Sequence, residues 1–89
     1  YVFETPGVYL EFTYKNPGTY LRYGLIKADE IKLYKDCAIG MQKKDFCKTL
    51  QIEEIMCDTI LVTNDDQTMY LYFNFKNNKL KDVKIECTL

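Results

Sequence analysis

The chain has 89 residues, of which 47% are hydrophobic and 28% are charged, and its formal net charge is −1. This length allows one domain, 1–89, and the apolar content excludes a disordered chain. The charge balance argues against nucleic acid as a partner, because proteins that bind nucleic acid carry a basic excess that neutralises phosphates.

The N-terminal third predicts a β-hairpin. Apolar and polar residues alternate over 8–15, Asn16-Pro17-Gly18 supplies a turn, and a returning strand follows over 19–27. One register places six large side chains on a single face, pairing Tyr14 with Leu21, Phe12 with Tyr23 and Leu10 with Leu25. The opposite face then carries an ion pair between Glu11 and Arg22.

The middle of the chain gives a mixed signal. Residues 30–36 alternate like a further strand. Between 38 and 56, Phe46, Cys47 and Leu50 have helical spacing, but Phe46, Leu50 and Ile52 would also share one face of a strand. We predict one short helix near residues 42–50 within an otherwise β protein.

The C-terminal third predicts three more strands. Residues 59–63 are rich in β-branched side chains, 64–67 form a polar turn cluster, and 68–76 alternate. Asn77-Asn78-Lys79 is expected to form a three-residue hairpin loop, which sets Phe73 opposite Val83 and Leu71 opposite Ile85. This third resembles the N-terminal one in style, but no internal repeat is apparent.

Together these elements predict a mainly β fold, with α+β as the alternative, of about six to seven strands. Antiparallel hairpins and meanders would form a small sandwich or a barrel-like domain. The apolar blocks are far shorter than the roughly 20 residues that span a bilayer, so we expect no membrane insertion.

The cysteines number four, at positions 37, 47, 57 and 87. An even set in a short chain is typical of disulfides in an oxidising compartment, whereas zinc and redox motifs need a closely spaced pair that is missing here. Of three possible connectivities we favour Cys37–Cys57 with Cys47–Cys87, and the alternative is reduced thiols packed in the core. These cysteines, with a chain that begins at Tyr1 rather than at methionine, predict a secreted, extracellular protein.

The residue types that are missing limit the possible chemistry. The chain has no histidine and no serine, which excludes serine triads and histidine acid–base catalysis. The acid pairs Glu53-Glu54 and Asp65-Asp66 are better explained as solvated side chains than as a glycosidase pair. We therefore expect no enzyme activity, no catalytic residue, no metal site and no cofactor.

The segment Tyr72-Phe73-Asn74-Phe75-Lys76-Asn77-Asn78-Lys79-Leu80, closing on Glu86-Cys87-Thr88, resembles the C-terminal strand–turn–strand of fungal guanyl ribonucleases. The resemblance covers a small part of the chain, and the helix and catalytic histidines of that family have no counterpart. It implies a catalytically dead, ribonuclease-like secreted effector.

Tyrosine is the most informative surface residue, with eight copies in the chain. The alternation places two pairs of tyrosines, with the single arginine, on outward faces, and we take these as candidate partner-binding residues: Tyr9, Tyr20, Arg22, Tyr70 and Tyr72. The alternative is that these tyrosines serve strand propensity, or that both faces are covered in a sandwich.

The function predicted from the sequence is a small, secreted, non-catalytic protein-binding module that acts as an effector, inhibitor or toxin-like antagonist on an extracellular or host protein. A small-molecule or lipid carrier with a cavity in a β-barrel is one alternative. A structural domain of a larger extracellular protein is another. The sequence names neither the partner nor the oligomeric state.

Overall fold

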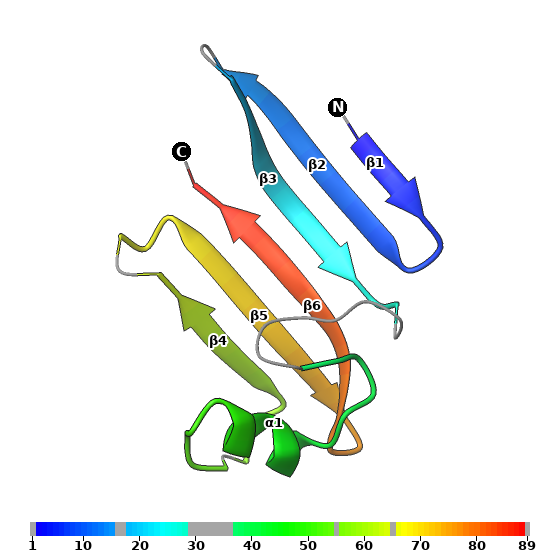
Figure 1. Ribbon diagram of the computed structural model, residues 1–89, viewed down its shortest axis with the longest axis vertical. Coiled ribbons are helices and arrows are strands. Elements are labelled where there is room, and N and C mark those ends of the chain that lie inside the picture. The colour runs from blue at the N-terminus through cyan, green and yellow to red at the C-terminus, as the bar shows by residue number, and fades with distance from the viewer. Residues whose placement is uncertain (1, 16–17, 29–36, 55, 65, 89) are drawn as a thin grey trace.

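A computed structural model describes residues 2–15, 18–28, 37–54, 56–64 and 66–88. Six strands form one antiparallel sheet in the order β1-β2-β3-β6-β5-β4, with a short helix against one face (Figure 1). The elements are β1 (Val2–Thr5), β2 (Val8–Lys15), β3 (Gly18–Ile26), α1 (Lys43–Thr49), β4 (Thr59–Thr63), β5 (Met69–Lys76) and β6 (Lys79–Cys87). The mainly β prediction and the helix near 42–50 are confirmed.

The predicted sandwich or barrel is wrong, because the described strands form a single open sheet whose edges are β1 and β4. β1 was not predicted at all. The alternating run at 30–36 lies outside the described residues. In the part of the chain that the structure describes, no helix is long and apolar enough to cross a membrane.

The sheet consists of two three-stranded meanders, β1-β2-β3 and β4-β5-β6, which meet where β3 pairs with β6 in antiparallel orientation. A shift of 61 positions takes the stretch YLEFTYKN at 9–16 onto YLYFNFKN at 70–77. The same shift takes Gly24 onto Ile85, which is the residue that pairs with it. It also takes the β2–β3 pair of Leu10 with Gly24 onto the β5–β6 pair of Leu71 with Ile85.

The strand order and the central register therefore relate the two meanders by an approximate two-fold axis through the Gly24–Ile85 pair, perpendicular to the sheet. The expectation of no internal repeat is wrong. The repeat was hard to see because the identity is concentrated in one strand of each meander, while β3 and β6 have diverged.

The register predicted for the N-terminal hairpin is wrong. In the structure Tyr14 pairs with Thr19, Phe12 with Leu21 and Leu10 with Gly24, and the register shifts between Glu11 and Phe12. Such a β-bulge moves the side chains beyond it to the other face of the sheet. Tyr23 and Leu25 therefore lie on the face of Tyr9 and Glu11, and Phe12 lies on the other face. The predicted ion pair survives, since Glu11 Oε1 lies 3.6 Å from Arg22 Nη1.

The C-terminal hairpin matches its prediction more closely. Phe73 pairs with Val83 and Leu71 with Ile85, as expected. The loop is shorter than predicted, because Lys76 pairs with Lys79 and leaves two turn residues, Asn77 and Asn78, both at positive φ (54° and 63°). Two consecutive residues at positive φ form the type I′ turn that suits tight hairpins, and a bulge at Asn74/Phe75 preserves the predicted pairs further along.

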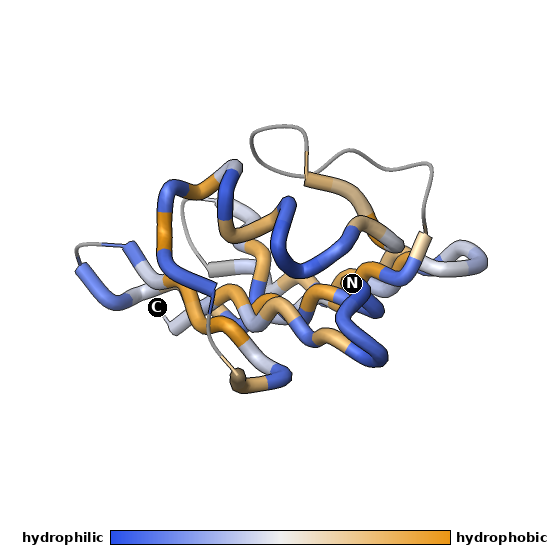
Figure 2. Tube along the Cα trace, turned by 90° about the horizontal axis from the view of Figure 1, so that it is seen from below, coloured by the Kyte–Doolittle hydropathy of each residue, from blue (hydrophilic) through white to orange (hydrophobic). Residues whose placement is uncertain are grey.

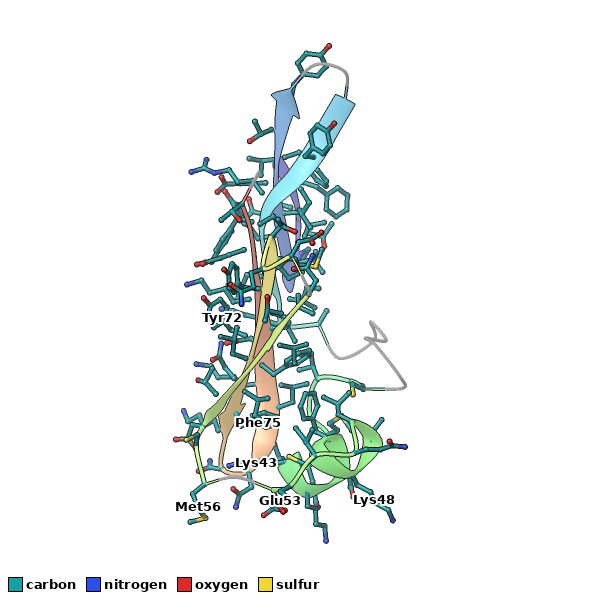
Figure 3. All side chains as sticks on the ribbon, turned by 90° about the vertical axis from the view of Figure 1, so that its left-hand side faces the viewer. Lys43, Lys48, Glu53, Met56, Tyr72 and Phe75 are labelled. Carbon is teal, nitrogen blue, oxygen red and sulfur yellow. The ribbon has the colours of Figure 1, made fainter. Side chains whose placement is uncertain are left out.

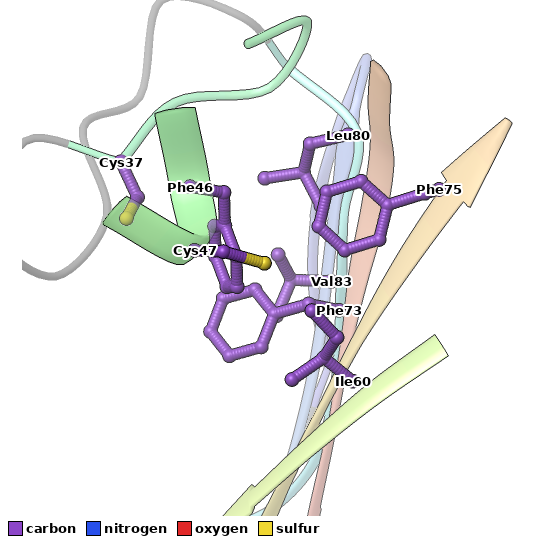
Figure 4. Close-up of a cluster of buried hydrophobic side chains, with 8 residues drawn as sticks. All are labelled: Cys37, Phe46, Cys47, Ile60, Phe73, Phe75, Leu80 and Val83. Carbon is purple, nitrogen blue, oxygen red and sulfur yellow. The ribbon is translucent and has the colours of Figure 1, made fainter. Parts of the chain in front are cut away.

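The core lies between α1 and the C-terminal meander. Phe46, fully buried at the centre of α1, contacts the rings of Phe73 and Phe75 at centroid distances of 4.7 and 5.2 Å. The buried cluster comprises Cys37, Phe46, Cys47, Ile60, Phe73, Phe75, Leu80 and Val83 (Figure 4). Figure 2, viewed from the end of the sheet where α1 lies, shows the helix segment on one side of the strands.

Backbone hydrogen bonds tie the segment before α1 to the β5–β6 turn. Gly40 N donates to Leu80 O at 2.7 Å, Leu80 N to Met41 O at 2.8 Å, and Lys43 N to Asn78 O at 2.8 Å. The helical alternative therefore holds for 43–49, because tertiary anchoring decides where the local pattern is ambiguous.

The predicted disulfide framework is not borne out: no disulfide joins the four cysteines, all of which fall within the described ranges. Cys47 belongs to the buried cluster around Phe73 of β5. Cys87, on β6, pairs with Met69 of β5, which lies four residues, or roughly 13 Å, along that strand from Phe73. A disulfide needs Cα atoms closer than about 7 Å. In the other predicted pair, Cys37 is buried and Cys57 is exposed, and no disulfide joins them.

Candidate functional site

The face of the sheet opposite α1, which we call the open face, has no helix over it among the described residues. Figure 3 shows Tyr72 on this side and the helix on the other. The strand registers carry two rows of side chains across it. The first row is Glu4, Tyr9, Leu25, Lys84, Tyr72 and Leu61, and the second is Val2, Glu11, Tyr23, Glu86, Tyr70 and Thr63.

The N-terminal part of the open face is centred on Tyr9. Its hydroxyl donates a hydrogen bond of 2.8 Å to Glu11 Oε2, and its ring meets the edge of Tyr23 at a centroid distance of 6.1 Å. The hydrogen bond to Glu11, followed by desolvation and the nearby negative charges, raises the pKa of Tyr9. Because Glu11 also pairs with Arg22, one carboxylate orients two of the predicted binding residues.

The C-terminal part of the open face is organised by Lys84. Its ammonium lies 2.9 Å from Glu86 Oε1 and 5.5 Å from the centre of the Tyr72 ring, a cation–π distance. The hydrogen bond and charge of Glu86 raise the pKa of Lys84. Nearer to α1, Asn74 Nδ2 donates to Asp82 Oδ1 at 2.7 Å, and Thr59 Oγ1 bonds Asn74 Oδ1 at 2.9 Å.

A shallow depression of about 290 Å³ lies where the two meanders meet, lined by Glu11, Arg22, Tyr23, Glu86 and Cys87. Burial raises the pKa of the Cys87 thiol at its side. Both glutamates in the lining are held by cations, Glu11 by Arg22 and Glu86 by Lys84.

The strand registers place the four predicted tyrosines on the open face, but not all together. Tyr9, Tyr70 and Tyr72 lie in the two rows, and Arg22, which the β2–β3 register skips at the bulge, lies beside them through its ion pair with Glu11. Tyr20 pairs with Thr13 nearer the hairpin turn, and it borders a separate depression of about 210 Å³ with Leu21 and Met69.

Sequence reasoning missed the middle of the open face, which is formed by Tyr23, Leu25, Lys84 and Glu86. Tyr23 and Leu25 were assigned to the other face because the bulge in β3 leaves no mark on the alternation. Lys84 and Glu86 join them through the β3–β6 pairing, which links strands far apart in the sequence. The shared stretch at 9–16 and 70–77 was the signal that could have revealed this pairing.

The remaining acidic residues do not gather into a site in the described residues. Glu53 and Glu54 are exposed, and Asp65 lies outside the described ranges. No group of three or more histidine, cysteine, aspartate or glutamate side chains in those ranges is arranged to hold a metal ion.

Comparison of the chain with protein-family models, with curated proteins and with solved structures found no match. The resemblance of the C-terminal strands to guanyl ribonucleases therefore has no support from these comparisons.

Proposed function

We propose that this protein is a non-catalytic protein-binding module whose contact surface is the open face. The observation that carries the proposal is the set of four tyrosines, Tyr9, Tyr23, Tyr70 and Tyr72, in two adjacent rows of the open face. Tyrosine provides a large amphipathic contact area with little loss of side-chain entropy, which is why it is enriched in binding surfaces.

The contacts within the open face support this role. Tyr9 is fixed by Glu11 and Tyr23, and Tyr72 is fixed by Lys84. A surface whose side chains are already ordered loses less entropy when a partner binds. The face therefore resembles a preorganised contact surface more than a flexible polar one.

The charges on the open face suit a protein partner better than nucleic acid. Within the two rows, Glu4, Glu11 and Glu86 balance Lys84, and Arg22 pairs with Glu11, so these rows carry no basic excess that could follow a phosphate backbone. Leu25 and Leu61 add apolar area within the first row. A mixture of tyrosine, leucine and paired charges is typical of protein interfaces.

A carrier role is less well supported, because a single open sheet encloses no barrel interior in which a ligand could be buried. A secreted effector, inhibitor or antagonist remains the biological setting that we propose from the sequence. The prediction of secretion rested on disulfides, whereas the proposed binding role rests on the side chains of the open face and does not depend on the compartment.

Photo-cross-linking tests the proposal. A benzophenone amino acid at position 72 reports on the open face, and the same amino acid at position 14 reports on the α1 side of the sheet, where Tyr14 is 73% exposed. We expect position 72 to capture a discrete protein from extracellular fluid or cell surfaces, and position 14 to capture none. Equal yields from both positions would contradict the proposal.

The captured protein then allows a matched affinity test. Tyr9→Ala and Tyr72→Ala should each weaken binding by about 2 kcal/mol or more if they are central to the contact. Tyr14→Ala is the control, because it removes the same side chain from the other face. Unchanged affinity in both open-face variants would rule out this surface as the binding site.

A further inference from the structure

The outer edge of β4 is an exposed strand edge with unusual chemistry. β4 is the last strand of the sheet, and its five residues, Thr-Ile-Leu-Val-Thr, contain no charge and no proline. Leu61 is 51% exposed and Val62 36%. Natural sheets usually protect such edges with lysine, proline or a bulge, because an unpaired edge is a template for another strand. Figure 3 looks onto this edge.

The backbone of β4 determines which residues can pair outward. Phe75 N donates to Asp58 O at 2.7 Å, just before β4 begins, so Asp58 directs its backbone groups toward β5. Hydrogen-bonding direction alternates along an antiparallel strand. Ile60 and Val62 therefore bond to β5, while Thr59, Leu61 and Thr63 direct their N–H and C=O groups outward.

The side-chain order of β4 is close to a palindrome about Leu61. If two copies of β4 pair in antiparallel orientation about this residue, Leu61 faces Leu61, Thr59 faces Thr63, and Ile60 faces Val62. The three outward-bonding residues then pair with one another, so one register satisfies both the hydrogen bonds and the side chains. Pairs of β-branched residues and of threonines stabilise antiparallel strands, and no like charges meet.

The other edge of the sheet provides a contrast. β1 is the counterpart of β4 under the internal two-fold axis, and Val2 is as exposed as Leu61, at 51%. However, β1 is shorter, contains Glu4 and is followed by Pro6. An edge with a charge and an adjacent proline matches the usual protection against pairing.

We propose that two copies of this protein pair through β4, in antiparallel register about Leu61, to form one continuous sheet. This goes beyond the proposed role of the open face. In the dimer the first row would continue across the junction, from Tyr72 and Leu61 of one copy to Leu61 and Tyr72 of the other. The axis that would relate the two copies passes between the two Leu61 residues and is perpendicular to the joined sheet. The two open faces therefore lie on the same side of that sheet. A dimer would therefore present a doubled tyrosine surface.

Sedimentation velocity over a range of protein concentrations tests the pairing with two matched variants. Leu61→Lys places two lysines opposite each other at the proposed axis, and it should raise the dimer dissociation constant by at least about tenfold. Val2→Lys makes the same change at an equally exposed position on β1 and should change that constant by less than about twofold. Far-ultraviolet circular dichroism verifies that both variants keep the fold.

Disulfide trapping tests the register without depending on the charge variant. In a Cys57→Ser background, Leu61→Cys brings two thiols together at the axis, where Cα atoms of hydrogen-bonded partners lie about 5.5 Å apart. Mild oxidation should then give a covalent dimer, and Val2→Cys in the same background should give little. The proposal is overturned if the wild-type protein stays monomeric at the highest concentration reached. Equal responses of the β1 and β4 variants, or a dimer disrupted by Val2→Lys, also overturn it.

Discussion

The two meanders of this sheet share strand order, central register and part of one strand's sequence, yet α1 covers the C-terminal one. Phe73 and Phe75 are 4% and 5% exposed, whereas Tyr14, the counterpart of Phe75, is 73% exposed and Phe12 is half-buried. The same alternation therefore gives a core in one half and a partly exposed face in the other. Burial is set by what packs onto a strand, and the strand pattern alone does not determine it.

This difference has an energetic consequence. The area of apolar surface removed from water is the main favourable term in folding, so the C-terminal meander with α1 should contribute most of the stability. The N-terminal meander depends on its neighbour through the β3–β6 pairs. Substitutions at positions related by the two-fold axis can measure how unequal the two halves are.

The largest effect is expected for Phe46→Ala. Phe46 is fully buried between the rings of Phe73 and Phe75, so its removal leaves a cavity beneath α1. Large-to-small changes at such sites cost about 3–5 kcal/mol, a large share of the stability of a small domain. Urea unfolding monitored by circular dichroism measures this loss, and a loss under about 1 kcal/mol would contradict the assigned core.

Thiol alkylation gives the same experiment a local readout. Cys47 is buried beside Phe46, while Cys57 is exposed and serves as the internal reference. In Phe46→Ala we expect Cys47 to react much faster than in the wild-type protein, because α1 opens more often. The rate for Cys57 should hardly change.

The next effect is a difference between two chemically identical changes at positions that the two-fold axis relates. Phe73→Ala should cost about 3–5 kcal/mol, because its side chain is buried under α1. Phe12→Ala should cost less, about 1–2 kcal/mol, because Phe12 buries only part of its ring. Denaturant titration of both variants measures the difference, and equal losses would show that the two halves are equally packed.

A smaller effect is expected at the axis itself. A Cβ added at Gly24 would lie 2.9 Å from Leu10 Cδ2 and 3.3 Å from Ile85 Cδ1, so Gly24→Ala crowds the contact between the meanders. The crowding atoms are side-chain ends that can move, and we expect a loss of about 1–2 kcal/mol. Gly18→Ala is the control, because among the described residues beyond its chain neighbours its Cβ would come no closer than 3.9 Å, to Tyr20 Oη. A loss at Gly18 as large as that at Gly24 would contradict this account.

The sequence was most informative where structure is local. The C-terminal hairpin pairs and the strand at 59–63 follow from alternation and turn residues, whereas the short helix was only one of two local alternatives and is decided by its tertiary contacts. The bulge in β3 could not be predicted, because both registers sort apolar side chains plausibly, and it moved Tyr23 to the open face. The disulfide prediction depended on counting cysteines, a compositional rule that carries no information about where Cys47 and Cys87 lie.

The middle of the open face was also beyond local reasoning. Lys84 and Glu86 reach Tyr23 because β3 pairs with β6, a contact set by the whole topology. Long-range strand pairs are not encoded in any one segment, so a single sequence reveals them only through a repeat. Here the repeat is concentrated in β2 and β5, which makes it faint in the sequence as a whole.

The smallest expected effect concerns Tyr9, whose partner Glu11 is replaced by Tyr72 in the other meander. Glu11 raises the pKa of Tyr9 above its ordinary value of 10.0 by accepting its hydrogen bond. The folded state therefore holds this proton more tightly than the unfolded chain. Stability from this contact is complete below pH 10 and is lost as the pH rises through the pKa of the folded state.

Glu11→Gln should lower the pKa of Tyr9 toward its ordinary value, because the variant removes the negative charge and weakens the acceptor. Glu4→Gln is the matched control, since Glu4 acts on Tyr9 only through its more distant charge and should shift that pKa less. An NMR titration of the tyrosine ring carbons resolves both changes. If Glu11→Gln leaves the pKa of Tyr9 unchanged, the hydrogen bond does not order this part of the open face, and the preorganisation argued for the N-terminal half would rest on the Tyr9–Tyr23 ring contact alone.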